Sequence, residues 1–313
     1  MKPLLAFGEA LIDLLQDPAE PSRYYRNAGG APANVAVGFA KLGGPAAFIG
    51  MLARDSFGQF LQAELAGFGV DTRWLSYTDA ANTALAVVSL ADGERSFHFY
   101  RPPSADLLFS PADFDAAAFA DAPLYHFCSN TLTHADIRAS TQAGLALATK
   151  HGCLISFDVN LRPSLWPAGT PDLAGIRTLL PQVQVLKCSL EEWQALAEGD
   201  EAALIAHCLG GQTRLILITD GSQPLRWITR DGAGTLAVEA VPVLDSTAAG
   251  DAFVAGLLYQ LARDDITAAA LDAWLGDASR LQSALRFASR CGGLACTRYG
   301  AFAALPTMAE LSA

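Results

Sequence analysis

Short apolar runs alternate with longer segments of helical periodicity along most of the chain. The run at 215–218 is apolar on both faces, as in a strand buried between two layers of helices. The expected strands are 4–8, 46–50, 124–128, 153–158, 183–188, 215–218, 225–229 and 235–240. The expected helices are 35–42, 57–65, 135–150, 172–180, 190–197, 201–209, 249–263, 266–275 and 277–296. This order predicts an α/β fold with a doubly wound, mostly parallel sheet flanked by helices.

One section departs from the strand–helix alternation. Segments 73–77, 84–90 and 96–101 are rich in strand-forming residues, and a tight turn at 91–94 joins the last two. We expect these strands, with the segment near 14–30, to form a small β-sheet lid built from about 14–30 and 72–103. No repeat or linker divides the chain, so we predict a single domain over residues 1–313.

Composition narrows the range of partners. The formal charge is −11 and no Lys/Arg run interrupts the acidic background, which argues against nucleic acid and anionic membranes as partners. No apolar run reaches the roughly 18 residues of a membrane span, and the N-terminus becomes acidic too early for a signal peptide. The six cysteines are scattered without a Cys-x-x-Cys pair, which is typical of buried thiols in a reducing compartment. We therefore expect a cytoplasmic protein.

The stretch 245–258 contains a candidate anion-binding loop followed by a candidate catalytic carboxylate. Small residues at 247–250 leave backbone N–H groups accessible, and the helix expected after them adds its unpaired N–H groups and the positive end of its dipole. Asp251 lies where a phosphate would be held. A carboxylate there suits a base that takes a proton from a hydroxyl attacking the phosphate. Asp is also a common helix cap, and this stretch alone does not decide between the two roles.

Several common signatures are absent from the sequence. It has no Gly-x4-Gly-Lys-Ser/Thr loop, no strand-linked Gly-x-Gly-x-x-Gly, no Gly-x-Ser-x-Gly and no His-Glu-x-x-His. These absences argue against P-loop NTPases, nicotinamide dehydrogenases, α/β-hydrolases and zincins.

Two glycine-rich loops, one near each end of the chain, make the pattern specific. The first runs from Gly29-Gly-Ala-Pro-Ala-Asn34 to Asp55-Ser-Phe-Gly58, and the second is 245–258. With the acid after the first strand, their order and separation resemble the ribokinase-like (phosphofructokinase-B type) carbohydrate kinases over nearly the whole chain. The resemblance implies a ribokinase-like fold and transfer of the γ-phosphate of ATP to a sugar hydroxyl.

The resemblance also implies roles for individual residues. Asp251 would be the general base, and the N–H groups of Ala248, Ala249 and Gly250 would form the anion hole. A carboxylate and an amide at fixed positions suit a polyol, since each can bind vicinal hydroxyls. The expected sugar-side residues are Asp13, Gly29, Gly30, Asn34, Phe99, Arg101, Asn160 and Arg162, with Phe99 covering the sugar as part of the lid.

The same resemblance implies which residues bind the nucleotide and the cations. Glu192 would help hold Mg²⁺ through water, and a monovalent cation, expected to be K⁺, would lie behind the anion hole. The expected nucleotide-side residues are Lys187, Ser189, Glu192, Thr219, Gly221, Ser222 and Ser289. The expected monovalent-cation ligands are Asp245 and Thr247, with the carbonyl groups of Ala295, Arg298 and Gly300.

The sequence departs from the family pattern at three places. Ala248 replaces a common glycine, which is tolerated if its φ is negative. Ser189 replaces a more usual Asn, which affects the detail of the metal site. A customary second glycine is missing after Gly221, which affects contacts to ATP. None of the three touches the proposed base.

The segment 157–166 bears on the choice of sugar. It resembles the Asp-x-Asn-x-Arg…Leu-Trp segment of fructokinases and 2-keto-3-deoxygluconate kinases. Arg162 would contact the substrate or a phosphate, to which its forked side chain is suited, or would be a surface residue tied to Asp158. We expect fructose first, 2-keto-3-deoxygluconate next and aminoimidazole riboside third. A catalytically silent sugar or nucleotide sensor is the alternative of another class, and a homodimer through the lid is a further expectation.

Overall fold

A ten-stranded sheet runs through the middle of the molecule in a computed structural model that describes residues 1–17, 19–91, 94–121 and 123–312. Nine strands follow the order β14-β13-β12-β11-β10-β9-β1-β4-β5, and β6 pairs with β4. Pairing is parallel except at β12–β13 and β13–β14. The strands are β1 (Leu4–Phe7), β4 (Ala46–Ala53), β5 (Val70–Asp71), β6 (Leu75–Thr78), β9 (Leu124–Cys128), β10 (Leu154–Asp158), β11 (Val185–Ser189), β12 (Leu215–Thr219), β13 (Leu225–Thr229) and β14 (Ala233–Leu236).

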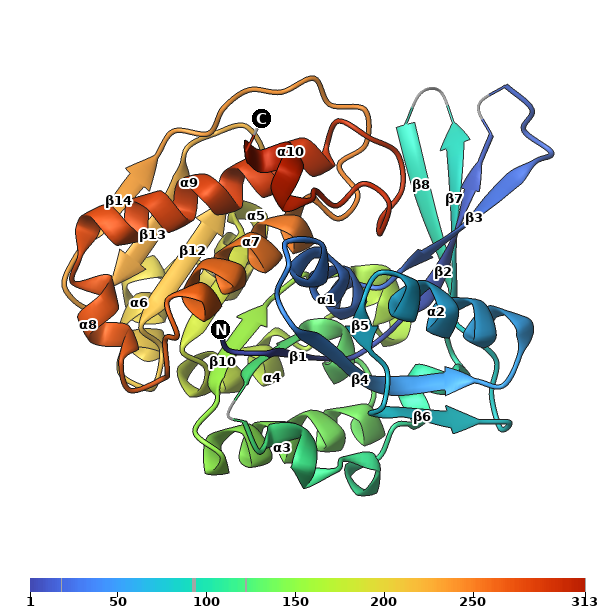
Figure 1. Ribbon diagram of the computed structural model, residues 1–313, viewed down its shortest axis with the longest axis horizontal. Helices are drawn as coiled ribbons and strands as arrows, with labels where there is room; N and C mark the ends of the chain where they lie inside the picture. Colours follow the sequence, from blue (N-terminus) through green and yellow to red (C-terminus); the bar gives the residue numbers. More distant parts are fainter. Residues whose placement is uncertain (18, 92–93, 122, 313) are drawn as a thin grey trace.

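Helices cover both faces of this sheet (Figure 1). One apolar core contains side chains of α1, α7 and α9, and a second, separate core contains side chains of α3, α4, α5 and α6. The helices are α1 (Ala31–Lys41), α2 (Ser56–Gly67), α3 (Ala135–Lys150), α4 (Leu173–Leu179), α5 (Leu190–Ala197), α6 (Glu201–Leu209), α7 (Ala249–Arg263), α8 (Leu271–Leu275), α9 (Ala278–Ala295) and α10 (Met308–Ser312). The expected doubly wound α/β architecture is confirmed.

The winding of the sheet reverses at β1. The chain proceeds from β1 to β4 on one side, and later returns to place β9 on the other side of β1. In open α/β sheets, ligands bind beyond the carboxyl ends of the strands at such a reversal. The residues that follow β1 and β9 are therefore candidates for the site.

A second, four-stranded sheet stands away from the large one (Figure 1). Its order is β3-β2-β7-β8, from β2 (Leu11–Gln16), β3 (Tyr24–Gly29), β7 (Leu85–Ala91) and β8 (Glu94–Tyr100). The β2–β7 pair is parallel and the other two pairs are antiparallel. This small separate sheet corresponds to the expected lid, and residues 92 and 93 of its expected turn lie outside the described residues.

Three expected elements differ from the structure. The strand expected at 73–77 is β6, which pairs with β4 of the large sheet instead of joining the lid, because Leu75 is buried against that sheet. The strand expected at 235–240 ends at Leu236, since its partner β13 offers pairing only from Leu225 to Ile228. The helix expected at 266–275 begins only at Leu271, after a turn in which Asp265 has a φ of 55°.

The cysteines and the helices agree with the expectations from composition. All six cysteines are free and five are buried. In the part of the chain that the structure describes, no helix is both long and apolar enough to cross a membrane.

Candidate active site

Two helices begin at the carboxyl edge of the large sheet and bring the two glycine-rich loops together. Asn34, in the first turn of α1, donates from Nδ2 to Oδ2 of Asp251, in the first turn of α7, over 2.7 Å. The two residues are 217 positions apart, and both are at least nine-tenths buried. The predicted sugar-side and phosphate-side signatures therefore meet at one hydrogen bond.

The protonation of Asp251 is set by its surroundings. Burial raises the pKa of Asp251 to about 7, and the charge of Asp158 contributes to the rise. The hydrogen bond from Asn34 and the charges of Lys187 and Arg162 act in the opposite direction, because each favours the ionised carboxylate. A carboxylate with a pKa near neutrality can accept a proton from an alcohol and release it afterwards.

The backbone before Asp251 differs from the expectation. Ala248 is the N-cap of α7 with a φ of 60°, in the left-handed region, so the condition of a negative φ for tolerating alanine is not met. This conformation costs a non-glycine residue roughly 1–2 kcal/mol, which explains why glycine suits the position. The N–H of Ala249 donates to the carbonyl of Ser246 over 3.2 Å, so it would have to leave that partner to bind an anion.

A buried lysine lies beside the expected anion hole. The Nζ of Lys187 would be only 2.9 Å from a Cβ atom placed on Gly250, and it lies 3.0 Å from Oδ2 of Asp158. Burial alone would lower the pKa of Lys187, but the charges of Asp158 and Glu192 more than offset this and raise it. The ammonium group is therefore charged and adjoins the first turn of α7.

Glu192 is held by backbone groups. Its Oε1 accepts from the N–H of Leu161 (2.6 Å) and its Oε2 from the N–H of Ser189 (2.7 Å), while Ser189 caps α5 in return. Both carboxylate oxygens are thus engaged, which suits contact with a metal through water. The Oδ1 of Asp158 is buried without a hydrogen-bond partner among the described residues, so it can accept from such a water.

The lid presents its candidate residues in one row. Asp13 pairs with Ala86 of β7, which pairs with Phe99 of β8, so their side chains lie on the same face. Asp13 lies within β2, not just after β1 as the sequence suggested. Burial raises the pKa of Asp13 to about 7, with the charges of Asp245 and Asp251 contributing. The expected sugar ligands Asp13 and Phe99 therefore face the same side of the lid.

The two glycines before α1 allow close packing at the start of the helix. A Cβ atom on Gly29 would lie 2.2 Å from Oδ2 of Asp13. On Gly30, whose φ is 107°, it would lie 2.4 Å from the carbonyl oxygen of Glu9. At Gly30 the obstacle is backbone, so no side chain fits there, whereas at Gly29 the Asp13 carboxylate would have to shift. These glycines therefore bring the start of α1 against the strand β2 that carries Asp13.

Arg101 has a different environment from the one expected of a sugar ligand. It is 1% exposed, and its guanidinium bonds Asp106 (2.8 Å), the hydroxyl of Thr133 (3.1 Å) and the carbonyl of Asn130 (2.8 Å). These contacts tie the end of β8 to the 3-10 turn η4 (Ser129–Leu132) after β9. In this structure Arg101 therefore anchors the lid, and its contact with the substrate stays a prediction.

Two residues that follow β10 border the same edge. Asn160 is buried with a φ of 38°, a conformation that Asn tolerates better than most residues. Arg162 is exposed and donates to the carbonyl of Leu161 over 3.1 Å. Its charge acts on both Asp158 and Asp251, so it lies within electrostatic reach of the candidate base.

The two chain segments that carry the expected monovalent-cation ligands are in contact with each other. The carboxylate of Asp245 is 2% exposed and accepts from the N–H groups of Thr247 (2.9 Å) and Gly300 (3.1 Å). The N–H groups of Leu244 and Asp245 both donate to the carbonyl of Cys296. A buried carboxylate thus lies against the segment that carries the expected carbonyl ligands Ala295, Arg298 and Gly300.

The remaining nucleotide-side candidates lie at the ends of neighbouring elements. Thr219 pairs with Ser189 at the carboxyl ends of β12 and β11. Gly221 has a φ of 54° in the loop that follows, where Ser222 is exposed. The hydroxyl of Ser289 on α9 is buried without a partner among the described residues, so it remains able to bind a ligand.

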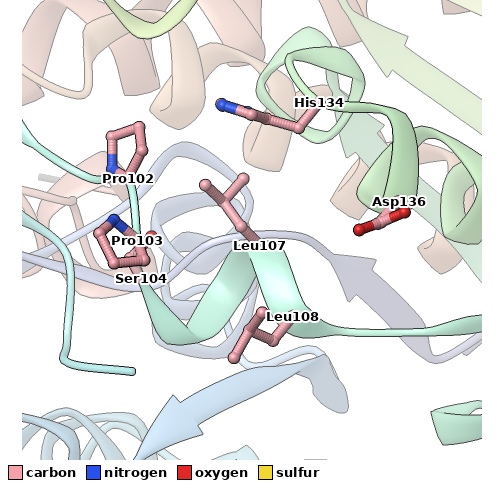
Figure 2. Close-up of a pocket in the computed structure, with 7 residues that line it drawn as sticks. All are labelled: Pro102, Pro103, Ser104, Leu107, Leu108, His134 and Asp136. Carbon is pink, nitrogen blue, oxygen red and sulfur yellow. The ribbon is translucent and has the colours of Figure 1, made fainter. Parts of the chain in front are cut away.

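A cavity of about 410 Å³ lies at the base of the lid, outside this constellation. Figure 2 shows Pro102 and Pro103 on one side of Leu107, with His134 and Asp136 on the other. None of the residues predicted from the sequence lines it. Glu9 and Asn130 were not predicted as site residues, although an acid directly after a first strand, as in Gly8-Glu9, was a usable signal.

Comparison with known proteins gives one consistent result. The family model described as "pfkB family carbohydrate kinase" matches residues 1–308. Fructokinase-1 of Oryza sativa subsp. japonica is 36% identical over 316 residues, which cover 98% of this chain and 96% of that protein. The crystal structure of fructokinase from Xylella fastidiosa with bound ATP has a TM-score of 0.95 and 47% identity, covering 99% of this chain and 97% of that one. A fructokinase double mutant from Vibrio cholerae O395, with fructose, ADP and potassium ion bound, has a TM-score of 0.88 and 34% identity, covering 100% and 97%.

Proposed function

Because the chain belongs to the pfkB family of carbohydrate kinases, we propose that it is an ATP-dependent fructokinase. It transfers the γ-phosphate of ATP to a terminal hydroxyl of fructose. The observation that carries the proposal is the Asn34–Asp251 hydrogen bond, which joins the sugar-side loop to a carboxylate whose pKa lies near neutrality. The similarity to fructokinases over almost the whole chain supports fructose as the acceptor.

The mechanism follows from positioning and charge neutralisation, as is usual for phosphoryl transfer. Asp13 and Asn34 hold ring hydroxyls, with Phe99 covering the sugar from the lid. Asp251 accepts the proton of the terminal hydroxyl as that oxygen attacks the γ-phosphate. The N–H groups of Ala248 and Gly250 and the ammonium group of Lys187 receive the developing negative charge.

The residues present fit the two cations that such a kinase uses. Mg²⁺ would be held through water by Glu192, with Asp158 beside it, and would neutralise charge on the triphosphate. A monovalent cation would be held by Asp245 and by carbonyl groups of the segment around Gly300. The buried carboxylate of Asp245 and its contact with this segment support that assignment.

Substrate choice is the direct test of the proposed function. We expect kcat/KM for fructose to exceed that for ribose and adenosine by more than about tenfold, because a site that bonds hydroxyls leaves its own polar groups unpaired with a poorer substrate. The measurement is ADP release with fructose, 2-keto-3-deoxygluconate, ribose, adenosine and aminoimidazole riboside. Arg162→Lys should lower turnover of fructose, since an ammonium group cannot reproduce the guanidinium fork.

Other outcomes of this assay discriminate the alternatives. Preference for the keto-deoxy acid would make Arg162 a carboxylate ligand and replace fructose in the proposal. Preference for aminoimidazole riboside would replace it with a nucleoside. Tight sugar binding without turnover of any of the five compounds would favour a sensor.

Potassium should raise the rate more than sodium at matched ionic strength. The reason is that a cation beside Asp245 would strengthen the positive potential at the start of α7. Initial rates in KCl, NaCl and tetramethylammonium chloride measure this. Equal rates in all three would remove the monovalent-cation site, and Asp245→Asn is the matched variant in which the potassium advantage should disappear.

The homodimer through the lid stays a prediction, which the mass of the protein in solution tests. It is supported by aromatic residues exposed on both edge strands of the small sheet. Tyr24 and Tyr25 lie on β3, and Tyr100 ends β8. Exposed edges of this kind favour pairing with another chain.

A further inference from the structure

Glu9 is a buried acid at the point where the large sheet reverses its winding. It follows β1 directly after Gly8 and is 1% exposed. Its Oε1 accepts from the N–H of Ala31 over 3.2 Å and from Nδ2 of Asn130 over 2.9 Å. Burial raises the pKa of Glu9, whereas Arg101 and Asn130 favour its ionised form. The Cys128 thiol is a third, weaker donor at 3.9 Å. A buried carboxyl with three donors is thus held at the edge where the substrate is proposed to bind.

On one side, Glu9 fixes the first turn of α1. The N-cap of this helix is Gly30, which has no side chain to bond the first N–H groups, and the carboxylate of Glu9 takes that place at Ala31. The backbone of Gly30 also packs closely against the carbonyl of Glu9. Asn34 lies one turn further on and donates to Asp251. The orientation of Asn34 toward the base therefore depends on a turn that Glu9 holds.

On the other side, Glu9 is tied to the lid through Asn130. The amide of Asn130 donates to Glu9, and its backbone carbonyl accepts from Arg101 at the end of β8. Arg101 keeps its own carboxylate partner, Asp106, at 2.7 Å. Loss of Glu9 would consequently not leave the guanidinium unpaired, which favours folding of a Glu9 variant.

We propose that Glu9 is a positioning residue for phosphoryl transfer, whose carboxylate fixes the first turn of α1 so that Asn34 meets Asp251. The proposal rests on Asp251 acting as the base of the proposed kinase. Glu9 itself touches neither substrate nor phosphate. Its effect is transmitted through Ala31 and Asn34, so it should appear in the titration of Asp251 and not only in stability.

The test replaces the Glu9 carboxylate, which accepts from the N–H of Ala31, and measures kcat as a function of pH. In Glu9→Leu the first turn of α1 loses its acceptor and Asn34 moves away from Asp251. Because the Asn34 hydrogen bond holds the pKa of Asp251 down, the acid limb of kcat should move to higher pH by about one unit. Glu9→Gln, which keeps an acceptor oxygen, should return the limb to the wild-type position.

Four further variants separate positioning from stability. Asn34→Ala should shift the limb as Glu9→Leu does, and the double variant should shift it no further, since both changes remove one interaction. Asp200→Ala removes another helix cap, the bond to the N–H of Ala203 on α6, and should lower stability without moving the limb. Asn130→Ala should shift it in the same direction and carries the test if Glu9→Leu does not fold.

A measurement without substrate keeps this result independent of the proposed function. The carboxyl ¹³C resonance of Asp251, assigned by its loss in Asp251→Asn, reports the same pKa in the free protein. The other titratable groups that act on Asp251 (Asp13, Asp158, Lys187, Arg162 and Cys128) keep their side chains in the Glu9 variant. Cys128 contacts Glu9, but burial raises the pKa of its thiol well above the usual value, so it stays neutral through the pH range of the test. An unmoved titration in folded Glu9→Leu would overturn the positioning role. A moved titration in a protein that does not phosphorylate fructose would overturn only the choice of substrate.

Discussion

Asp251→Asn should lower kcat for fructose by about 10²- to 10⁴-fold, the range that a general base contributes. Asn at this position can still accept the hydrogen bond from Asn34, so the sugar loop stays in place and KM should change little. It cannot take a proton from the attacking hydroxyl. Steady-state ADP release with fructose measures the effect, and a variant that retains more than about a tenth of the wild-type kcat would reduce Asp251 to a helix cap.

The pH dependence gives the control for this variant. Wild-type kcat should fall below about pH 7, where Asp251 becomes protonated. The folded pKa of this acid lies above its unfolded value of 3.8, so the folded state binds more protons between these values and stability falls as pH rises through them. Asp251→Asn removes that penalty. The variant should therefore be more stable than wild type at pH 8 in urea unfolding, with the difference vanishing toward pH 4.

Lys187→Met should lower kcat by about 10²- to 10³-fold, the loss typical of removing one preorganised group that stabilises developing charge. The Lys187 side chain is nine-tenths buried and its Nζ atom lies beside Gly250, so water has little access to this position. Strand β11 carries no second lysine or arginine that could replace it. The variant should also be less stable, because it leaves Asp158 as an unpaired buried carboxylate. Initial rates and urea unfolding measure the two effects separately.

A double variant distinguishes catalysis from support of the fold. Lys187→Met with Asp158→Asn removes both buried charges, so most of the lost stability should return. The activity should stay low, since the ammonium group is still absent. Recovery of activity together with stability would mean that the lysine acts only by neutralising Asp158.

The sequence contains strong information about the order of elements. Helices such as 135–150 and 201–209 match α3 and α6 because their apolar periodicity is imposed by burial against one sheet face. Edge elements were less predictable. The segment around 75 is equally rich in strand formers whether it joins the lid or β4, and only the position of the partner strand decides between them.

In the site, too, some features could be predicted from the sequence and others were decided by tertiary packing. Local spacing marked the stretch around Asp251 as a candidate anion site, because small residues at a helix start leave backbone N–H groups accessible. The roles of Asp251 as base and of Asn34 as sugar ligand came from the resemblance to the carbohydrate kinases. The 2.7 Å contact between Asn34 and Asp251 joins residues 217 positions apart and exists only after both helices pack at one sheet edge.

Arg101 and Ala248 have environments that the sequence did not reveal. The arginine has the residue type expected of a substrate ligand, but its partners Asp106, Thr133 and Asn130 come from other elements that surround it on folding. The φ of Ala248 is likewise set by the junction with α7. The sequence by itself determined the order of the elements and the candidate residues for binding sugar, phosphate and a proton. The tertiary structure alone decided which of them meet and which charges are buried, because hydrogen bonding and burial depend on neighbours that are distant along the chain.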